Sequence, residues 1–332
     1  MIILMSPLVE YAGWNRKNKK RSRIACWAWV LASVLLVHWI SQQQPAGTRM
    51  LLIIVALLLS MKSVVTHEYF RDHPSRTLNW MQWIVFLVGW PGMRPGIFSK
   101  FPGNVRSDFL LPIQKGTLRL IVGMVVFGLA VLVWNLQAPA FRPEKVVLLQ
   151  LNPISMKPTS LLATLLAMVA FSLIVHFGVF NWLTGFWRML GVKTNTLFVA
   201  PLLSRSLAEF WGKRWNLAFS EMTTIAVFRP VKKRFGQNVA TFLGFVFSGA
   251  LHELAISFPV NAGYGLPMAY FAIHGFAIYF ENRLLINCDW FRTNRLLGIF
   301  WTVTWIMLPL PLLFHGPFLQ GCIWPLLQWQ LV

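Results

Sequence analysis

The sequence predicts an all-α, polytopic integral membrane protein with about eight or nine transmembrane helices and additional re-entrant or interfacial helices. Of its 332 residues, 56% are hydrophobic and only 12% are charged, whereas soluble domains carry about 25% charged residues. Aromatic residues make up 15% of the chain, which excludes intrinsic disorder. The apolar residues also gather in charge-poor runs, and a run of about 20 such residues is long enough to cross a bilayer.

Charge-poor runs place the expected spans in order along the chain. The first six runs are residues 24–40, 50–65, 118–136, 159–184, 236–258 and 264–282. Residues 296–332 carry no charge and are long enough for two further spans, with a break in the proline-containing region 309–317. The segment 79–93 is short and ends in Pro-Gly, which favours a re-entrant or interfacial helix.

The distribution of Lys and Arg predicts the orientation. With the N-terminus on the cytoplasmic side and 79–93 not crossing, 26 of the 30 Lys and Arg residues lie inside, as the positive-inside rule requires. The net charge of +20 is therefore mostly a topology signal. Residues 1–23 are expected to form a basic cytoplasmic tail, because no small-residue cleavage site follows. The whole chain, 1–332, is expected to be one membrane domain.

Other functional classes are disfavoured by what the sequence lacks. A nucleic-acid-binding protein would not hide its few charges between long apolar runs. The three cysteines have no CxxC spacing, so neither a disulfide framework nor a thiolate zinc site is expected. Nucleophile-elbow, P-loop and dinucleotide-binding motifs are all missing. We expect no bound metal and no bound cofactor.

The polar region holds an unusual string from Ser204 to Asn216, SRSLAEFWGKRWN. Ser206 and Glu209 have the spacing of a capping box, which predicts a helix starting at Leu207. On such a helix Trp211 and Trp215 would share one face. The string can be an interfacial amphipathic helix with an aromatic anchor, or part of a site.

Two sets of basic residues flank this helix and its continuation. Lys213 and Arg214 belong to the string itself, and Arg229, Lys232, Lys233 and Arg234 form a dense cluster further along. The cluster can be a signal that fixes membrane topology. It can also bind a phosphorylated, anionic ligand at the membrane face.

The expected span 236–258 contains an ionisable pair, His252 and Glu253. Ala240, Gly244 and Ser248 precede His252 at intervals of four, so this helix stripe lets a neighbouring backbone approach closely. Ionisable groups within a span are costly, and they indicate function by default. Because Glu253 is adjacent in sequence, it points about 100° away from His252, and a direct pair is not expected. Ile256 stands where an HExxH zinc motif needs histidine.

A second imidazole, His274, lies in the next expected span. It can face His252 from an antiparallel helix, or it can be a buried histidine that serves packing only. Glu281 closes that span and is interpreted as a boundary residue. His176, alone in the span 159–184, is interpreted as a packing residue.

The order of these motifs resembles the wax-synthase branch of the membrane-bound O-acyltransferase superfamily. That branch shows a pattern like S-x-S-L-x-[DE]-FWG-[RK]-RWN, then a downstream RP, then HEL within a helix. Here the counterparts are residues 204–216, Arg229-Pro230 and His252-Glu253-Leu254. The resemblance is specific over residues 204–275. The string Trp90-Pro91-Gly92-Met93-x-Pro95 also looks like a feature of bacterial members, which implies a bacterial inner membrane.

The resemblance implies an acyl-CoA:alcohol O-acyltransferase with its catalytic core region in residues 185–282. The family's intramembrane histidine maps onto His252, and its conserved polar residue maps onto Asn216. Histidine suits a general base for an alcohol. Asn216 can hold the thioester carbonyl or position His252. Supporting roles are implied for Trp215, Glu209, Trp211, His274 and Glu253, and CoA phosphate contacts for Lys213, Arg214, Arg229, Lys232, Lys233 and Arg234.

The expected partners are the lipid bilayer, acyl-CoA as co-substrate and a hydroxylated lipophilic acceptor, with no nucleic acid. Within the enzyme class, a short acyl group placed on a sugar or secondary metabolite is an alternative. A membrane transporter is the alternative from another class. It predicts inverted repeats with matching broken helices, and the sequence shows neither.

Overall fold

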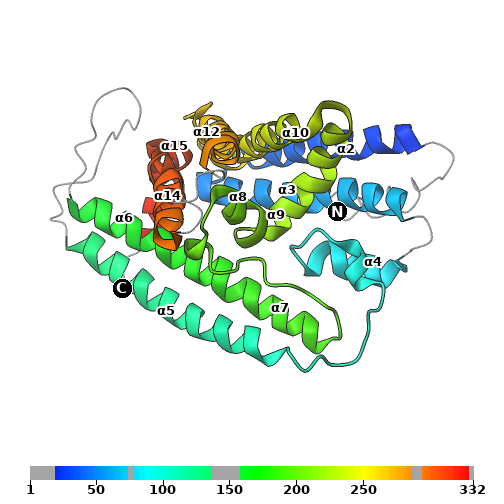
Figure 1. The fold of residues 1–332 in the computed structure, drawn as a ribbon. Helices are drawn as coiled ribbons and strands as arrows, with labels where there is room; N and C mark the ends of the chain where they lie inside the picture. The colour runs from blue at the N-terminus through cyan, green and yellow to red at the C-terminus, as the bar shows by residue number, and fades with distance from the viewer. Residues whose placement is uncertain (1–18, 74–77, 137–157, 286–293, 329–332) are drawn as a thin grey trace.

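A computed structural model describes residues 19–73, 78–136, 158–285 and 294–328, and all regular secondary structure in these residues is helical (Figure 1). Six of the described helices are long and apolar enough to cross a bilayer. They are Arg21–Ile40, Ala46–Asp72, Leu110–Asn135, Pro158–Met189, Leu217–Val260 and Arg295–Leu313. The prediction of an all-α, multi-pass membrane protein is confirmed. Six are found where eight or nine were expected, and most of the expected tail 1–23 lies outside the described residues.

Helices α2 (Lys19–Ile40) and α3 (Ala46–Asp72) form an antiparallel pair. Helix α2 extends the first expected span at its start, and α3 extends the second at both ends. The sequence places Lys62 near the end of the second expected span and counts it among the cytoplasmic basic residues, whereas the structure places it inside α3. Its side chain is fully buried, not in an aqueous loop. The ammonium group donates to the carbonyl oxygens of Phe86 and Trp90. Carbonyls at a helix C-terminus are natural partners for a cation.

Helix α4 (Trp80–Gly89) is the short element expected in residues 79–93. Its 10 residues rise about 15 Å, half of the roughly 30 Å hydrocarbon core, so α4 by itself does not cross. A capping box between Asn79 and Gln82 starts the helix. The short 3-10 helix η1 (Pro95–Phe98) follows.

Helix α5 (Leu110–Asn135) runs beside one long helix made of α6 (Pro158–Phe171), the π-helical stretch η2 (Ser172–Val179) and α7 (Phe180–Met189) (Figure 1). Small residues allow the close contact. A Cβ atom added at Gly185 would lie 2.8 Å from the carbonyl oxygen of Phe109. This pair corresponds to the expected spans 118–136 and 159–184.

The expected span at 236–258 is half of a helical hairpin. The first arm comprises α9 (Leu217–Thr223), η5 (Thr224–Phe228) and the start of α10 (Arg229–His252). The arm ends at Gly236, whose φ of 83° breaks the helix and is accessible chiefly to glycine. The second arm runs through the rest of α10 into η6 (Glu253–Ser257) and α11 (Phe258–Val260). The two arms are antiparallel, since Gly244 faces the methyl group of Thr223.

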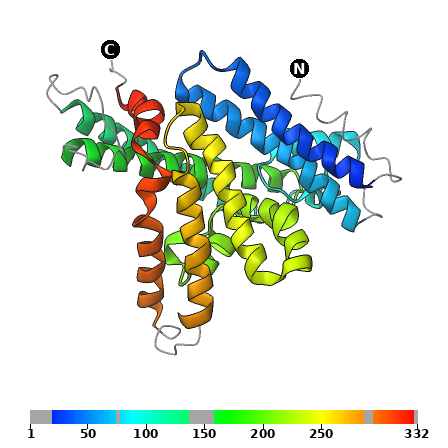
Figure 2. The same ribbon diagram turned by 90° about the horizontal axis from the view of Figure 1, so that it is seen from above.

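Helix α12 (Leu266–Phe280), continued by η7 (Glu281–Leu285), occupies the expected span 264–282. It lies beside α10 and α14 (Arg295–Met307) (Figure 2). A Cβ atom added at Gly249 in α10 would lie 2.9 Å from Cα of Met268, so these two backbones pack closely.

The expectation of two spans in residues 296–332 is wrong for the described part of that region. One candidate span, Arg295–Leu313, is found, composed of α14 and α15 (Leu310–Leu313). Beyond the expected break, α16 (Gly316–Phe318), η8 (Leu319–Ile323) and α17 (Trp324–Leu327) adjoin one another as a single helical run of 12 residues, which at 1.5 Å per residue is too short to cross a bilayer. Pro317 and Pro325 fall in this stretch, and proline lacks the N–H that a helix interior needs. Hydropathy alone does not reveal how short this last helical run is.

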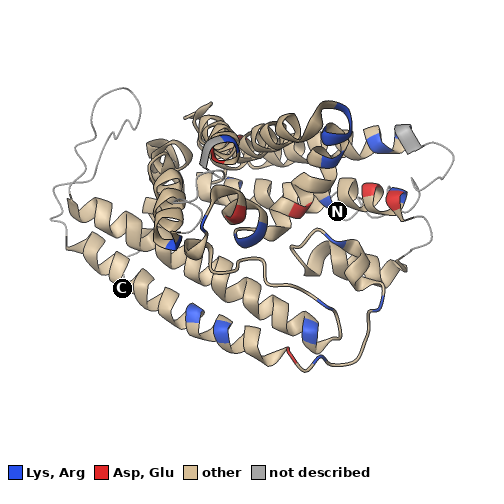
Figure 3. Cartoon of the chain, in the orientation of Figure 1, with Lys and Arg blue, Asp and Glu red and all other residues tan. Residues whose placement is uncertain are grey.

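Charged side chains lie largely at helix ends and in loops, and the middles of most long helices are uncharged (Figure 3). This placement agrees with a bilayer environment, in which a charge at the centre of a span is costly.

Candidate active site

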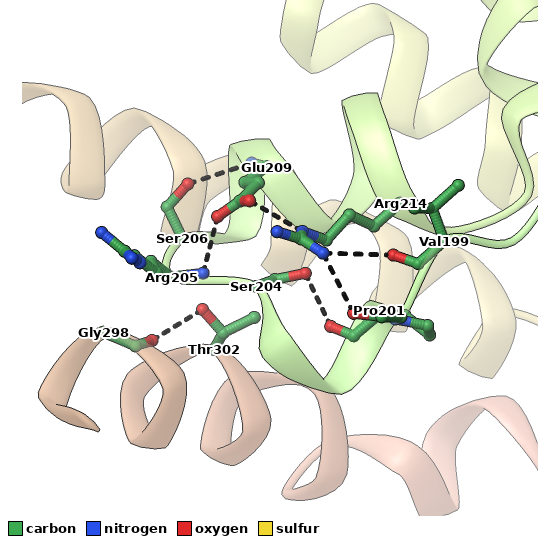
Figure 4. A network of polar contacts seen from close by, with 10 residues as sticks. Val199, Pro201, Ser204, Arg205, Ser206, Glu209, Arg214, Gly298 and Thr302 are labelled. Atoms are coloured by element: carbon green, nitrogen blue, oxygen red, sulfur yellow. Dashed lines mark hydrogen bonds and ion pairs between the residues drawn. The ribbon is translucent and has the colours of Figure 1, made fainter. Parts of the chain in front are cut away.

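The string at residues 204–216 begins a helix where the sequence predicts it. Helix α8 (Leu207–Glu209) starts after Ser206, whose hydroxyl oxygen accepts from the Glu209 backbone N–H at 3.0 Å (Figure 4). Glu209 reaches back as expected, but it accepts from the backbone N–H of Arg205, at 2.8 Å. The predicted helix start is therefore confirmed, with a shifted partner for the carboxylate.

A second carboxylate, Glu281, holds the same helix start from across the fold. Its side chain is buried and accepts from the backbone N–H groups of Leu207 at 2.8 Å and Ala208 at 3.3 Å. The indole N–H of Trp301 also donates to it, at 3.1 Å. The boundary interpretation of Glu281 missed this role. A carboxylate suits this place because the first N–H groups of a helix lack intrahelical partners.

Replacing Glu281 by glutamine should destabilise the protein by about 3 kcal/mol, because buried N–H donors cost about 1–3 kcal/mol each when unpaired. The glutamine keeps the shape but places an NH2 group against N–H donors. Thermal unfolding in detergent measures the effect. A matched control is Glu281→Asp, which keeps the charge with shorter reach and should lose less. Equal stability of the Gln variant and the wild type would contradict the capping role.

The expectation that Trp211 and Trp215 share a helix face is wrong. The π-helical turn η4 (Phe210–Arg214) follows α8, and Trp215 has extended backbone angles. The two indoles therefore point to different neighbours. Trp211 contacts the rings of Phe271 and His274, and Trp215 contacts those of Phe198 and His176. The string is a broken connector with buried residues at Ser204, Leu207 and Phe210, and not one amphipathic helix.

Asn216 occupies the joint between this connector and the hairpin. Its φ of 43° is left-handed, a region that asparagine tolerates better than most residues. Its side-chain oxygen accepts from the backbone N–H of Phe219 at 3.2 Å and so caps α9. In the described part of the chain, the NH2 group of Asn216 has no hydrogen-bond partner.

The hairpin places Asn216 at about the same height along its two arms as His252, although 36 positions separate these residues in the sequence. The ring of Phe219, in the first turn of α9, lies 5.4 Å from the ring of His252 at the end of α10. Phe271 of α12 also packs against the imidazole, at 4.2 Å between centroids. The structure thus gathers the two expected catalytic residues into one neighbourhood, with no direct bond between them.

One hydrogen bond fixes the tautomer of the His252 imidazole. Its Nδ1 lies 2.7 Å from the carbonyl oxygen of Ser248. A carbonyl can only accept, so Nδ1 carries the proton and Nε2 of the neutral ring holds a free lone pair. The imidazole is therefore arranged to accept a proton at Nε2.

Glu253 turns away from His252, as its sequence position predicts. Its carboxylate accepts from the backbone N–H groups of Gly265 at 2.9 Å and Met268 at 3.0 Å. These groups lie at the N-terminus of α12, so Glu253 anchors α12 to the end of the hairpin.

His274 is completely buried in α12. Its Nδ1 donates to the carbonyl of Tyr270 at 2.8 Å, and its ring lies against Tyr270 and Trp211. These contacts agree with the packing interpretation.

The six basic residues do not form one group. Arg214 is engaged within the fold, 2.7 Å from Glu209 and bonded to the carbonyls of Val199 and Ala200 (Figure 4). Partial burial of Glu209 would raise its pKa, but hydrogen bonds from Arg205 and Arg214 and the charges of both arginines lower the pKa overall. Lys213 is exposed near Asn216.

The remaining four basic residues form the hairpin tip, a name we use for Arg229, Lys232, Lys233 and Arg234. All four are exposed and precede the turn at Gly236. The second arm from the turn to His252 rises roughly 24 Å at 1.5 Å per residue. The hairpin tip and Lys213 therefore lie at opposite ends of the first arm.

A third histidine, interpreted from the sequence as a packing residue, lies beside the connector. His176 of η2 contacts Trp215, the neighbour of Asn216, with 5.3 Å between ring centroids. The sequence does not indicate the contact between His176 and Trp215, because the connector and η2 are far apart along the chain. No group of three or more His, Cys, Asp or Glu with metal-binding arrangement occurs in the described residues.

The fold and site define a multi-pass membrane protein with a histidine-centred helical hairpin. Residues 194–273 match the Membrane bound O-acyl transferase family. The probable long-chain-alcohol O-fatty-acyltransferase 6 of Arabidopsis thaliana is 28% identical over 144 residues, 38% of this chain and 41% of the relative. The acyl-CoA--sterol O-acyltransferase 1 of the same plant is 32% identical over 129 residues, 36% and 37% of the two chains.

The long-chain-alcohol O-fatty-acyltransferase of Simmondsia chinensis is 30% identical over 95 residues, 26% of this chain and 27% of the relative. These matches confirm the resemblance to the wax-synthase-like branch of the membrane-bound O-acyltransferases. The matching segments span less than half the length of each of these curated relatives.

Proposed function

We propose that the protein transfers an acyl group from acyl-CoA to the hydroxyl group of a lipophilic alcohol, forming an ester of the wax or sterol type. The observation that carries this proposal is the hairpin, which sets the unpaired NH2 group of Asn216 and the Nε2 lone pair of His252 at one level. The family match over residues 194–273 and the names of the relatives support the reaction class. Residues 185–282 are the proposed catalytic core within a single membrane domain.

The residue types at the hairpin account for the reaction in two steps. The alcohol oxygen bonds to the thioester carbonyl carbon while Nε2 of His252 takes the hydroxyl proton. The carbonyl π electrons move onto oxygen, which accepts from the NH2 group of Asn216. The carbonyl then re-forms, the C–S bond breaks, and the CoA sulfur leaves with the electron pair. His252 returns its proton to that thiolate. CoA is a good leaving group because thiol pKa values are near 8.5, and no enzyme nucleophile is needed.

We place the hairpin tip and the N-terminus on the cytoplasmic side of the membrane. The support is the distribution of Lys and Arg expected from the sequence, in which 25 of the 30 lie on that side once the buried Lys62 is left out. The string Trp90–Pro95 resembles bacterial members, which supports a bacterial inner membrane. The hairpin tip then meets cytoplasmic acyl-CoA. CoA carries phosphates at one end and the thioester at the other, which suits a separation of roughly 24 Å between the hairpin tip and His252.

Neutralising two charges of the hairpin tip, Lys232→Gln with Lys233→Gln, should raise KM for acyl-CoA about five- to tenfold. Each exposed ion pair contributes up to about 1 kcal/mol, and the effect should shrink as salt rises. The measurement is initial rate in sealed inside-out vesicles, where added acyl-CoA reaches only the cytoplasmic face.

A control variant and the orientation of the vesicles test this prediction. A control that neutralises the exposed Lys100 and Lys193 should leave KM unchanged. An equal rise in KM for acyl-CoA in both double variants would show that the hairpin tip has no specific role in binding it. Activity only in right-side-out vesicles would reverse the proposed orientation.

The acceptor is identified with purified protein in detergent, labelled acyl-CoAs of several chain lengths, and a panel of long-chain alcohols, sterols, diacylglycerol and sugars. We expect ester with a lipophilic alcohol. Ester formed only with sugars and short acyl donors would support the alternative acceptor class. If no ester forms with any pair, and the protein moves solute across liposomes, it is a transporter.

A further inference from the structure

We propose that His176 is a second hydrogen-bond donor of the active centre and binds the carbonyl oxygen of the acyl thioester through its Nε2–H group. This inference rests on the proposed acyl transfer and adds a residue from a different transmembrane helix. It starts from the position of His176 within η2, where backbone bonds run from residue i to i+5, as from the Phe180 N–H to the Val175 carbonyl. Such π-helical turns are uncommon and occur frequently at functional sites.

Three segments converge on the His176 ring. Phe198, from the loop before the connector, stacks on it at 4.6 Å between centroids. Trp215, from the connector, meets it edge-on at 5.3 Å. Phe180, one turn along the same helix, lies at 6.2 Å. The imidazole is thus held in place next to the residue that precedes Asn216.

The hydrogen bond of His176 differs in kind from those of His252 and His274. Both of those rings place Nδ1 against a backbone carbonyl and so carry the Nδ1 proton. The Nδ1 of His176 instead lies 3.3 Å from the hydroxyl oxygen of Ser172. We assign the Ser172 hydroxyl as the donor of this pair, since the described residues offer its proton no other acceptor.

With Nδ1 accepting, the neutral imidazole of His176 carries its proton on Nε2. This N–H has no partner among the described residues, and the side chain is only partly buried. His252 offers a lone pair, whereas His176 and the NH2 group of Asn216 offer donors. His176 reaches this region through Trp215, and His252 through Phe219, which lie one residue before and three residues after Asn216. In the proposed arrangement the two donors bind the carbonyl oxygen that becomes negative during transfer, since donors aimed at developing charge stabilise it most.

Two substitutions of His176 distinguish hydrogen-bond donation by its Nε2–H group from packing by its ring. His176→Phe keeps an aromatic ring against Phe198 but removes the N–H, and should lower kcat about 100-fold, as loss of an oxyanion donor does. His176→Gln keeps an N–H at similar reach and should stay within about tenfold of wild type. The control His73→Phe changes a histidine that stacks on Tyr69, away from the site, and should be silent.

Two unreactive CoA analogues test the contact itself. A 2-oxoalkyl-CoA keeps the carbonyl, and an alkyl-CoA thioether lacks it. Wild type should bind the ketone better, and His176→Phe should lose this preference while His176→Gln keeps it. The proposal is overturned if the Phe variant keeps wild-type kcat, or if both variants lose activity while the preference for the ketone survives. Failure of the acyl-transfer proposal is recognised separately, by wild type that forms no ester, and the binding comparison still reports on His176.

Discussion

Replacing His252 by alanine should lower kcat about 10²–10⁴-fold, the contribution usual for a general base. The Nδ1 bond to the Ser248 carbonyl holds the ring with Nε2 as acceptor, and no other described side chain is placed to do the same next to Asn216. The wild-type rate should also fall at acidic pH, since a protonated imidazole cannot accept the alcohol proton.

The measurement is kcat for ester formation by folded, detergent-purified variants across pH. Size-exclusion chromatography and thermal unfolding serve as checks that the His252→Ala variant is folded. The control is His73→Ala, which removes an imidazole outside the site. A variant at position 252 that keeps the wild-type rate and pH profile would eliminate His252 as the base.

Asn216→Asp should separate catalysis from folding. Aspartate keeps the capping oxygen for the Phe219 N–H and tolerates the left-handed backbone, but it removes the NH2 group. Stability should stay near wild type, while kcat falls about 10²-fold, as for a lost oxyanion donor.

Asn216→Ala is the matched comparison. It loses the cap and places alanine at φ 43°, so it should cost about 2 kcal/mol of stability as well as activity. Thermal unfolding and steady-state kinetics on the same preparations resolve the two effects. An Asp variant that keeps full activity would show that Asn216 acts only as a helix cap.

The sequence predicts the membrane class and several helix boundaries well, because both follow from local chemistry. Charge-poor runs locate spans, the Ser206 cap starts α8, and the expected start of the span at residue 236 coincides with the break at Gly236. The resemblance over residues 204–275 pointed to Asn216 and His252. That these two residues lie level is a property of the hairpin, which hydropathy does not reveal.

What escaped prediction depends on contacts between distant segments. The helix after Glu209 ends early because Trp215 is extended and Asn216 starts a new helix, and the pattern of Trp residues hides this. Glu281 caps a helix 73 or 74 positions away. Lys62 bonds the end of α4 from within a span. An isolated ionisable residue in an apolar run is the one signal that marks such positions beforehand.

The most direct test of the account measures CoA thiol release and ester formation together, with purified wild type and His252→Ala, labelled acyl-CoA and a long-chain alcohol. The account predicts one ester for each thiol released by wild type, and both products reduced at least 100-fold in the variant. Thiol release without ester would contradict alcohol transfer. Equal ester formation by wild type and variant would contradict a centre built on His252.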